Sequence, residues 1–403
     1  MRRTLGQGPA RWVGLCFLGF LGLALGVCLG ASASALPDGV APEQQQRVAQ
    51  LFARAARLIQ KKDFQGAAQV YEQALKIEPD SFEVLNNLGV IYARLGEYPQ
   101  AANAYERALR LKPGSFPLLV NLGLAYFKGR EFGKAIKPLA QAVALEPDNF
   151  QAEALLGMSY YWARDFTAAS AELEKLIAAK PGNQALQYLL CESYLETGQD
   201  QKVLDFFRSI PQGSFQPVTA HLLMGEADDG LNLTRQAIEE FKAAAALAPN
   251  QSGVHFGLGF LHWKNHDNQN AAAEFWREMQ AGGLVAQSEA YLGDIAIKEG
   301  ANKQARALIE QALRLTPKTA LADYDLGILD AQAKNYGAAA IALKDAIRLD
   351  PGQRAAHDEL ARVYRAQGEM GLAAAELKSA ASISAQNQPK LFQMVSAAPP
   401  SAN

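Results

Sequence analysis

Two histidines, His262 and His266, stand four residues apart, the spacing at which two side chains on one helical face can ligate zinc. No third ligand accompanies them, and residues 265–268 (Asn-His-Asp-Asn) have the composition of a turn. Residues 257–259 (Gly-Leu-Gly) lack the third glycine and the preceding strand of a dinucleotide-binding loop. We therefore expect no metal site and no cofactor.

Other catalytic patterns are missing as well. The sequence contains no His-Glu-x-x-His, no Gly-x4-Gly-Lys-Ser/Thr and no Gly-x-Ser-x-Gly. His221, His255 and His357 occupy positions that leucine fills elsewhere in the chain, which favours packing over chemistry. Because a function must be argued from a site, and no catalytic site is visible, we predict that the chain is not an enzyme.

Large aromatic residues are the better candidates, and they favour binding. Rigid aromatic side chains on an otherwise polar surface often supply most of the binding energy of an interface. Several such residues fall outside the positions that pack one helix on the next, with a lysine and a glutamate beside them. The predicted partner-binding groove consists of Phe127, Lys128, Tyr161, Trp162, Tyr188, Glu192, Phe256, Phe260 and Trp263.

A 34-residue period sets the elements that must position these side chains. Proline recurs at this spacing at Pro79, Pro113, Pro147, Pro181, Pro249, Pro317 and Pro351, and Phe215 and Gly283 stand at the two positions without it. A strict period between 20 and 50 residues is typical of a solenoid.

One unit, residues 82–115, illustrates the pattern. Leu85, Leu88, Gly89 and Tyr92 give a large, large, small, large series at helical spacing, and Pro113 ends a second helix. Small residues let two helices approach closely where they cross. Since two short helices cannot bury their apolar faces alone, each unit must stack on the next one.

The pattern resembles the tetratricopeptide repeat family, over about residues 48–387. The resemblance implies an all-α fold, a right-handed α-solenoid of about ten stacked helix-turn-helix units. It also implies that the first helix of each unit lines a concave groove that holds a segment of a partner protein.

The N-terminus has the order of a secretory signal peptide. Arg2, Arg3 and Arg11 precede an apolar stretch at 15–29, and Ala33-Ser34-Ala35 is a small-x-small cleavage site. We expect cleavage after Ala35 and a periplasmic or secreted protein of exported bacterial type, with no membrane insertion afterwards. Two alternatives remain open, an uncleaved N-terminal membrane anchor and lipidation at Cys28.

Composition limits the partners. The chain has 39 Lys and Arg against 41 Asp and Glu, and removing the N-terminal arginines makes it more acidic. It has no basic stripe, so we expect no nucleic-acid partner. Cleavage also leaves Cys191 as the last cysteine, in a small-residue column that predicts a buried packing role.

The predicted organisation is a signal peptide at 1–35, a linker at 36–47, the solenoid at 48–387 and a disordered tail at 388–403. Within the tail, residues 391–395 form an apolar patch that either docks on the last unit or has no role. We expect a non-catalytic protein-interaction scaffold or assembly factor of the cell envelope, with a protein or peptide partner. The alternatives are a solenoid that binds a small molecule or glycan, stacking sugar rings on Tyr161, Trp162 and Trp263, and an ancillary subunit of an envelope enzyme complex.

Overall fold

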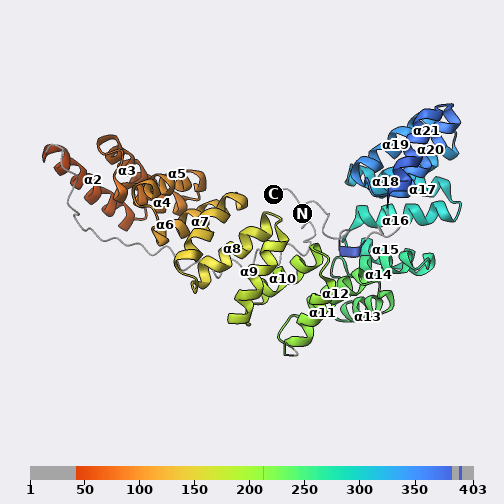
Figure 1. Cartoon of the computed structure of the whole chain (residues 1–403), viewed down its shortest axis with the longest axis horizontal. Helices are drawn as coiled ribbons and strands as arrows, with labels where there is room; N and C mark the ends of the chain where they lie inside the picture. Colours follow the sequence, from red (N-terminus) through yellow and green to blue (C-terminus); the bar gives the residue numbers. More distant parts are fainter. Residues whose placement is uncertain (1–41, 212, 384–389, 393–403) are drawn as a thin grey trace. The chain divides into compact units, whose positions relative to one another are not determined.

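The computed structural model of the chain describes residues 42–211, 213–383 and 390–392. These residues form twenty α-helices, stacked in adjacent pairs as in a tetratricopeptide-type solenoid (Figure 1). The expected all-α fold is confirmed. The predicted signal peptide and Cys28 lie outside the described residues. None of the described helices is both long enough and apolar enough to cross a membrane.

The helices fall into two compact units, which meet in sequence between Thr197 and Gly198. Even-numbered helices are the first helices of their repeats and odd-numbered helices are the second. The N-terminal unit contains α2 (Pro42–Gln60), α3 (Phe64–Ile77), α4 (Phe82–Leu95), α5 (Tyr98–Leu111), α6 (Phe116–Lys128), α7 (Phe132–Leu145), α8 (Phe150–Trp162), α9 (Phe166–Ala179) and α10 (Gln184–Glu196).

The C-terminal unit has a further eleven helices and, in addition, the short segment Lys390–Phe392. Its helices are α11 (Asp200–Ser209), α12 (Pro217–Gly230), α13 (Thr234–Leu247), α14 (Val254–Lys264), α15 (Asn268–Gln280), α16 (Val285–Lys298), α17 (Asn302–Leu315), α18 (Ala320–Gln332), α19 (Tyr336–Leu349), α20 (Arg354–Gln367) and α21 (Met370–Ser382).

Two expected boundaries differ from the structure. Residues 42–47, expected in a linker, form the first turns of α2. Lys390, Leu391 and Phe392, expected in a disordered tail, are described, and Leu391 is fully buried in the core of the C-terminal unit rather than on the last repeat.

Close helix crossings explain the glycine column. A Cβ built on Gly123 would lie 2.4 Å from Leu139, and one on Gly225 would lie 2.6 Å from Phe241. In each case the large residue stands sixteen positions further along, on the second helix of the same repeat. The glycines therefore hold paired helices at a distance that a larger side chain would not allow.

The turn between the paired helices also repeats. One residue in each repeat adopts a left-handed backbone conformation, with φ between 60° and 84°: Lys62, Gly96, Arg130, Arg164, Gly198, Asn232, His266, Gly300, Lys334 and Gly368. The spacing is 34 residues throughout. His266 is one of these turn residues and lies beyond the end of α14, so it does not share a helical face with His262.

The missing proline at position 283 has a structural cause. The fully buried Glu278 accepts hydrogen bonds from the backbone N–H groups of Gly253, Phe256 and Leu284, at 2.7, 3.2 and 3.1 Å. A Cβ on Gly283 would lie 1.8 Å from a Glu278 carboxylate oxygen. The glycine thus makes room for a carboxylate that satisfies free N–H groups near the starts of α14 and α16.

Candidate functional site

Five aromatic rings form a continuous series in the N-terminal unit. The ring centroids of Phe127 and Phe132 lie 5.3 Å apart, Phe132 stacks on Trp162 at 5.8 Å, and Trp162 meets Tyr161 edge-on at 5.1 Å. Tyr161 in turn meets Phe166 at 5.5 Å. All five side chains are partly exposed. We call this series the aromatic ladder. It is a partly exposed apolar strip that spans two repeats.

The repeat places the ladder. Phe127, Tyr161 and Trp162 lie near the ends of the first helices α6 and α8, as predicted, whereas Phe132 and Phe166 are the first residues of the second helices α7 and α9. Sequence reasoning missed these two phenylalanines. A signal was present, because Phe64, Tyr98, Phe132 and Phe166 form an aromatic column at the 34-residue spacing.

Glu192 joins the ladder to α10. The hydroxyl groups of Tyr161 and Tyr188 both donate hydrogen bonds to its carboxylate. Desolvation by burial raises the pKa of Glu192 to about 7, and the two tyrosine hydrogen bonds oppose the shift. The structure thus brings Tyr161, Tyr188 and Glu192 together, beside the ladder, as a polar group that exchanges its proton near neutral pH. Lys128 ends α6 and is partly exposed.

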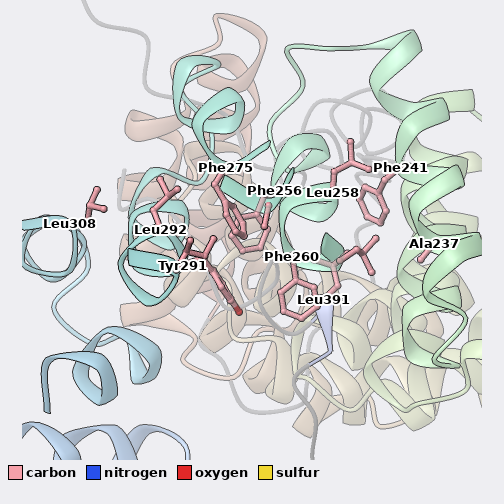
Figure 2. Close-up of a cluster of buried hydrophobic side chains, with 13 residues drawn as sticks. Ala237, Phe241, Phe256, Leu258, Phe260, Phe275, Tyr291, Leu292, Leu308 and Leu391 are labelled. Atoms are coloured by element: carbon pink, nitrogen blue, oxygen red, sulfur yellow. The ribbon is translucent and has the colours of Figure 1, made fainter. Parts of the chain in front are cut away.

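The predicted aromatic residues of α14 are arranged differently. Phe256 and Phe260 are fully buried, in a core cluster with Phe275 and Tyr291 (Figure 2). They therefore do not provide the exposed anchors that the sequence led us to expect. The physical reason is that α16 supplies Tyr291 on one side, and the cluster also contains Leu391 from the C-terminal segment.

Trp263 is partly exposed but engaged. Its indole N–H donates to Asp294 Oδ2 at 2.5 Å, and Lys298 Nζ lies 4.7 Å from its ring centroid and 2.6 Å from the same carboxylate oxygen. The Tyr291 ring meets it at 5.0 Å. Trp263 and Asp294 are 31 residues apart, the same separation as Tyr161 and Glu192, so an aromatic donor paired with an acid of the next repeat occurs in both units.

The C-terminal segment, Lys390–Phe392, makes specific contacts with three helices. Lys390 Nζ lies 2.8 Å from Asp200 Oδ2 of α11, and the Leu391 backbone N–H donates to Asp229 Oδ2 of α12 at 2.9 Å. The Leu391 side chain, fully buried, joins the cluster that contains Phe260 of α14 (Figure 2). Asp229 also pairs with Lys264 at 2.7 Å.

Asp325 of α18 is a buried acid with no hydrogen-bond partner for either carboxylate oxygen among the described residues. Burial raises its pKa well above the ordinary value, the negative charge of Asp294 adds to the shift, and Lys298 opposes it. Burial without a hydrogen-bond partner disfavours the charged form of this carboxyl group.

The histidines serve the fold. His221, His255 and His357 pair with Glu240, Glu274 and Glu376 of the following helix at 2.6, 2.7 and 2.6 Å, and each pair is 19 residues apart. His262 pairs with Asp267 at 3.1 Å. Within residues 42–211, 213–383 and 390–392, no group of three His, Cys, Asp or Glu side chains is placed to hold a metal ion.

Comparison with known sequences identifies the repeat. Sequence models described as "Tetratricopeptide repeat" match residues 52–116 and 292–354, and residues 94–159. No curated protein matches the chain.

Several solved structures are similar. The APC/C hetero-tetramer Cut9–Hcn1 has 13% identity and a TM-score of 0.39, covering 89% of this chain and 96% of that one. A tetratricopeptide repeat protein from Parabacteroides merdae has 16% identity and a TM-score of 0.35, covering 70% and 99%. Yeast Tom70 has 15% identity and a TM-score of 0.37, covering 88% and 95%.

Proposed function

Since the chain is a tetratricopeptide repeat protein, and such proteins are typically non-catalytic scaffolds for protein–protein interaction, we propose that it binds a segment of a partner protein on the aromatic ladder of its N-terminal unit. The observation that carries this proposal is the continuous contact of five partly exposed rings from Phe127 to Phe166. Glu192 supplies a hydrogen-bonding group beside the apolar strip. A partner segment with apolar or aromatic side chains and few charges fits this surface.

Trp162 is the residue to test. It contacts both Phe132 and Tyr161, so it lies in the middle of the ladder, and truncating a central aromatic anchor costs about 2 kcal/mol or more of binding free energy, about thirtyfold in affinity. We expect Trp162→Ala to reduce partner recovery from an envelope extract, measured by quantitative mass spectrometry, by that factor. The recovered partner is then titrated against both proteins to obtain the affinities.

Trp276→Ala is the matched control. Trp276 is 42% exposed on α15, a second helix of the other unit, so its truncation leaves the ladder unchanged. Unchanged recovery with Trp162→Ala, at unchanged helicity, contradicts the proposal. A glycan array tests the alternative that the aromatic rings stack sugars. Glycan binding that Trp162→Ala removes, with no protein partner recovered, would favour that alternative.

The proposed location is the periplasm or the exterior of the cell, where the chain would serve an envelope complex. The support is the signal-like order of residues 1–35. Sequencing of the mature N-terminus is expected to begin at Leu36. A start at a lipid-modified Cys28, or an intact N-terminus in the membrane fraction, would replace this location by one of the two anchored alternatives.

A further inference from the structure

The contacts that hold the C-terminal segment, Lys390–Phe392, are of the kinds that hold a bound peptide ligand. Three kinds of contact hold it: an ion pair from Lys390 to Asp200, a backbone hydrogen bond from Leu391 to Asp229, and burial of the Leu391 and Phe392 side chains. The acidic residues fix the register, and the apolar residues supply the contact area. The segment belongs to no repeat, so its position is not set by the 34-residue period of the helices.

The site is built around buried carboxylates. Asp200 and Asp229 are only 4% and 1% exposed. A Cβ on Gly230 would lie 2.4 Å from the carboxyl group of Asp200, so the glycine leaves the space that this side chain occupies. A buried carboxylate is costly unless it is paired, and among the described residues the ion-pair partner of Asp200 is Lys390. Asp200 also stands in the first turn of α11, where a helix N-terminus favours a carboxylate, and Lys390 adds a cation from outside the repeats.

We propose that this surface of α11, α12 and α14 is an acceptor site for a peptide of defined chemistry, a basic residue followed directly by leucine and an aromatic residue. The chain's own Lys390–Phe392 occupies the site until a partner segment of the same chemistry displaces it. The site lies in the C-terminal unit and shares no residue with the aromatic ladder, so it is independent of the function proposed above.

The covalent link between the C-terminal segment and the helices sets how strongly this segment competes with an external peptide. Six residues, 384–389, separate the last described residue after α21 from Lys390 along the chain. A short tether of this kind gives an effective concentration in about the millimolar range. An external peptide must therefore bind the intact chain much more weakly than it binds a chain whose own segment has been released.

The test uses a fluorescein-labelled peptide with the sequence of residues 387–395, titrated by anisotropy against the full-length protein. We expect the peptide to bind the Leu391→Asp variant at least about tenfold more tightly than it binds the wild type, because the variant's own segment no longer competes. Adding Asp200→Asn to that variant should weaken binding about tenfold, since it removes the partner of the peptide lysine. Asp205→Asn is the matched control, because Asp205 is an exposed acid on the same helix, paired with Arg208.

Three outcomes would overturn the proposal: no binding to a folded Leu391→Asp variant, equal binding to variant and wild type, or binding that Asp200→Asn leaves unchanged. If Leu391→Asp does not fold, Lys390→Glu serves instead, because that side chain is 37% exposed and its change leaves the core intact. Light scattering tests whether the C-terminal segment of one chain occupies the acceptor site of a second copy. A wild-type dimer that Leu391→Asp converts to monomer means that the segment binds a second copy, which contradicts occupancy within one chain.

Discussion

The first residue of the second helix differs between the repeats of the N-terminal unit and the first four second helices of the C-terminal unit. In the N-terminal unit this position is aromatic at Phe64, Tyr98, Phe132 and Phe166, and two of these rings belong to the aromatic ladder. In the C-terminal unit it is polar at Asp200, Thr234, Asn268 and Asn302, whereas Tyr336 and Met370 stand there in the last two repeats; Asp200 pairs with Lys390. The period fixes where a side chain stands, and the residue type at that position sets whether the local surface is apolar or acidic.

Glu192 and Asp294, the acids that accept hydrogen bonds from Tyr161 and Trp263, also differ between the two units. Glu192 accepts from two tyrosines and its raised pKa keeps it largely uncharged below neutral pH, whereas Asp294 has Lys298 beside it and accepts from Trp263. The Glu192 cluster is therefore close to neutral, whereas Asp294 and Lys298 form an ion pair. Equivalent substitutions in the two units should therefore have unequal effects.

The largest expected effect comes from overfilling a helix crossing in one unit. A Cβ on Gly257 would lie 2.2 Å from the Phe241 ring, so Gly257→Leu should lower the free energy of unfolding of the C-terminal unit by about 3 kcal/mol. Gly123→Leu should do the same to the N-terminal unit. Each unit is measured by urea titration of residues 36–403, which lack Trp12, followed by fluorescence. Replacing Trp162 by Phe isolates the C-terminal signal, and replacing Trp263 and Trp276 by Phe isolates the N-terminal one. A common shift of both transitions would remove the distinction between the units.

The second largest effect is expected from replacing the paired acids, Asp294 and Glu192, by the corresponding amides. Asp294→Asn removes the ion pair with Lys298 and the charged acceptor of Trp263, so we expect a loss of about 2 kcal/mol at pH 6. Glu192→Gln should change stability by less than about 0.5 kcal/mol at that pH, since the carboxyl group is already largely protonated. Equal losses in the two variants, measured by urea unfolding, would contradict the contrast between an ion pair and a neutral cluster.

The pH dependence of the same pair is a smaller effect. The pKa of Glu192 is raised in the folded state to about 7, so the folded chain binds its proton more tightly than the unfolded chain does. Its contribution to stability is complete below the unfolded pKa of about 4.3 and falls as the pH rises to about 7. Glu192→Gln should therefore gain on the order of 1 kcal/mol relative to wild type between pH 6 and pH 8. A difference that stays constant with pH would show that this carboxyl group is not the one that titrates.

The smallest expected effect is equal in both units. Lys62 and Lys334 adopt φ of 60° and 62°, a conformation that glycine adopts without strain. Lys62→Gly and Lys334→Gly should each raise the free energy of unfolding by about 0.5 kcal/mol, read as a rise in the melting temperature. Lys61→Gly, at the neighbouring position with ordinary φ, should not stabilise. Unequal changes in melting temperature for Lys62→Gly and Lys334→Gly would contradict the expectation that the two turns, with nearly equal φ, are equally strained.

The repeat fold could be read from the sequence because it depends on contacts within and between neighbouring repeats. The pairing of Gly89 with Tyr105 and the packing position of His255 both follow from spacing alone, although the Glu274 partner of His255 was not foreseen. The tyrosines and acid of the N-terminal unit were also predicted, but as groove residues rather than as one hydrogen-bonded cluster. Local periodicity thus specifies the frame and many of the side chains on it.

The C-terminal unit shows where periodicity gives no information. Lys390 and Asp200 are 190 residues apart, and no repeat relates them. Phe256 and Phe260 lie outside the packing columns, yet they are buried, because coverage by Tyr291 and Leu391 depends on tertiary contacts. An off-column position in the sequence therefore does not establish that a side chain is exposed.

The left-handed turn residues, equally spaced from Lys62 to Gly368, have a consequence for how the length of this protein can change. Ser81-Phe82 and Ser115-Phe116 are the same dipeptide at the same point of two successive repeats, each just at the start of a first helix. Loss of residues 82–115 would rejoin Ser81 to Phe116 and restore the original junction. Loss of a single residue inside a helix would instead turn every later side chain of that helix by about 100°. Gene duplication and recombination can therefore lengthen or shorten the chain in whole repeats without creating a new boundary.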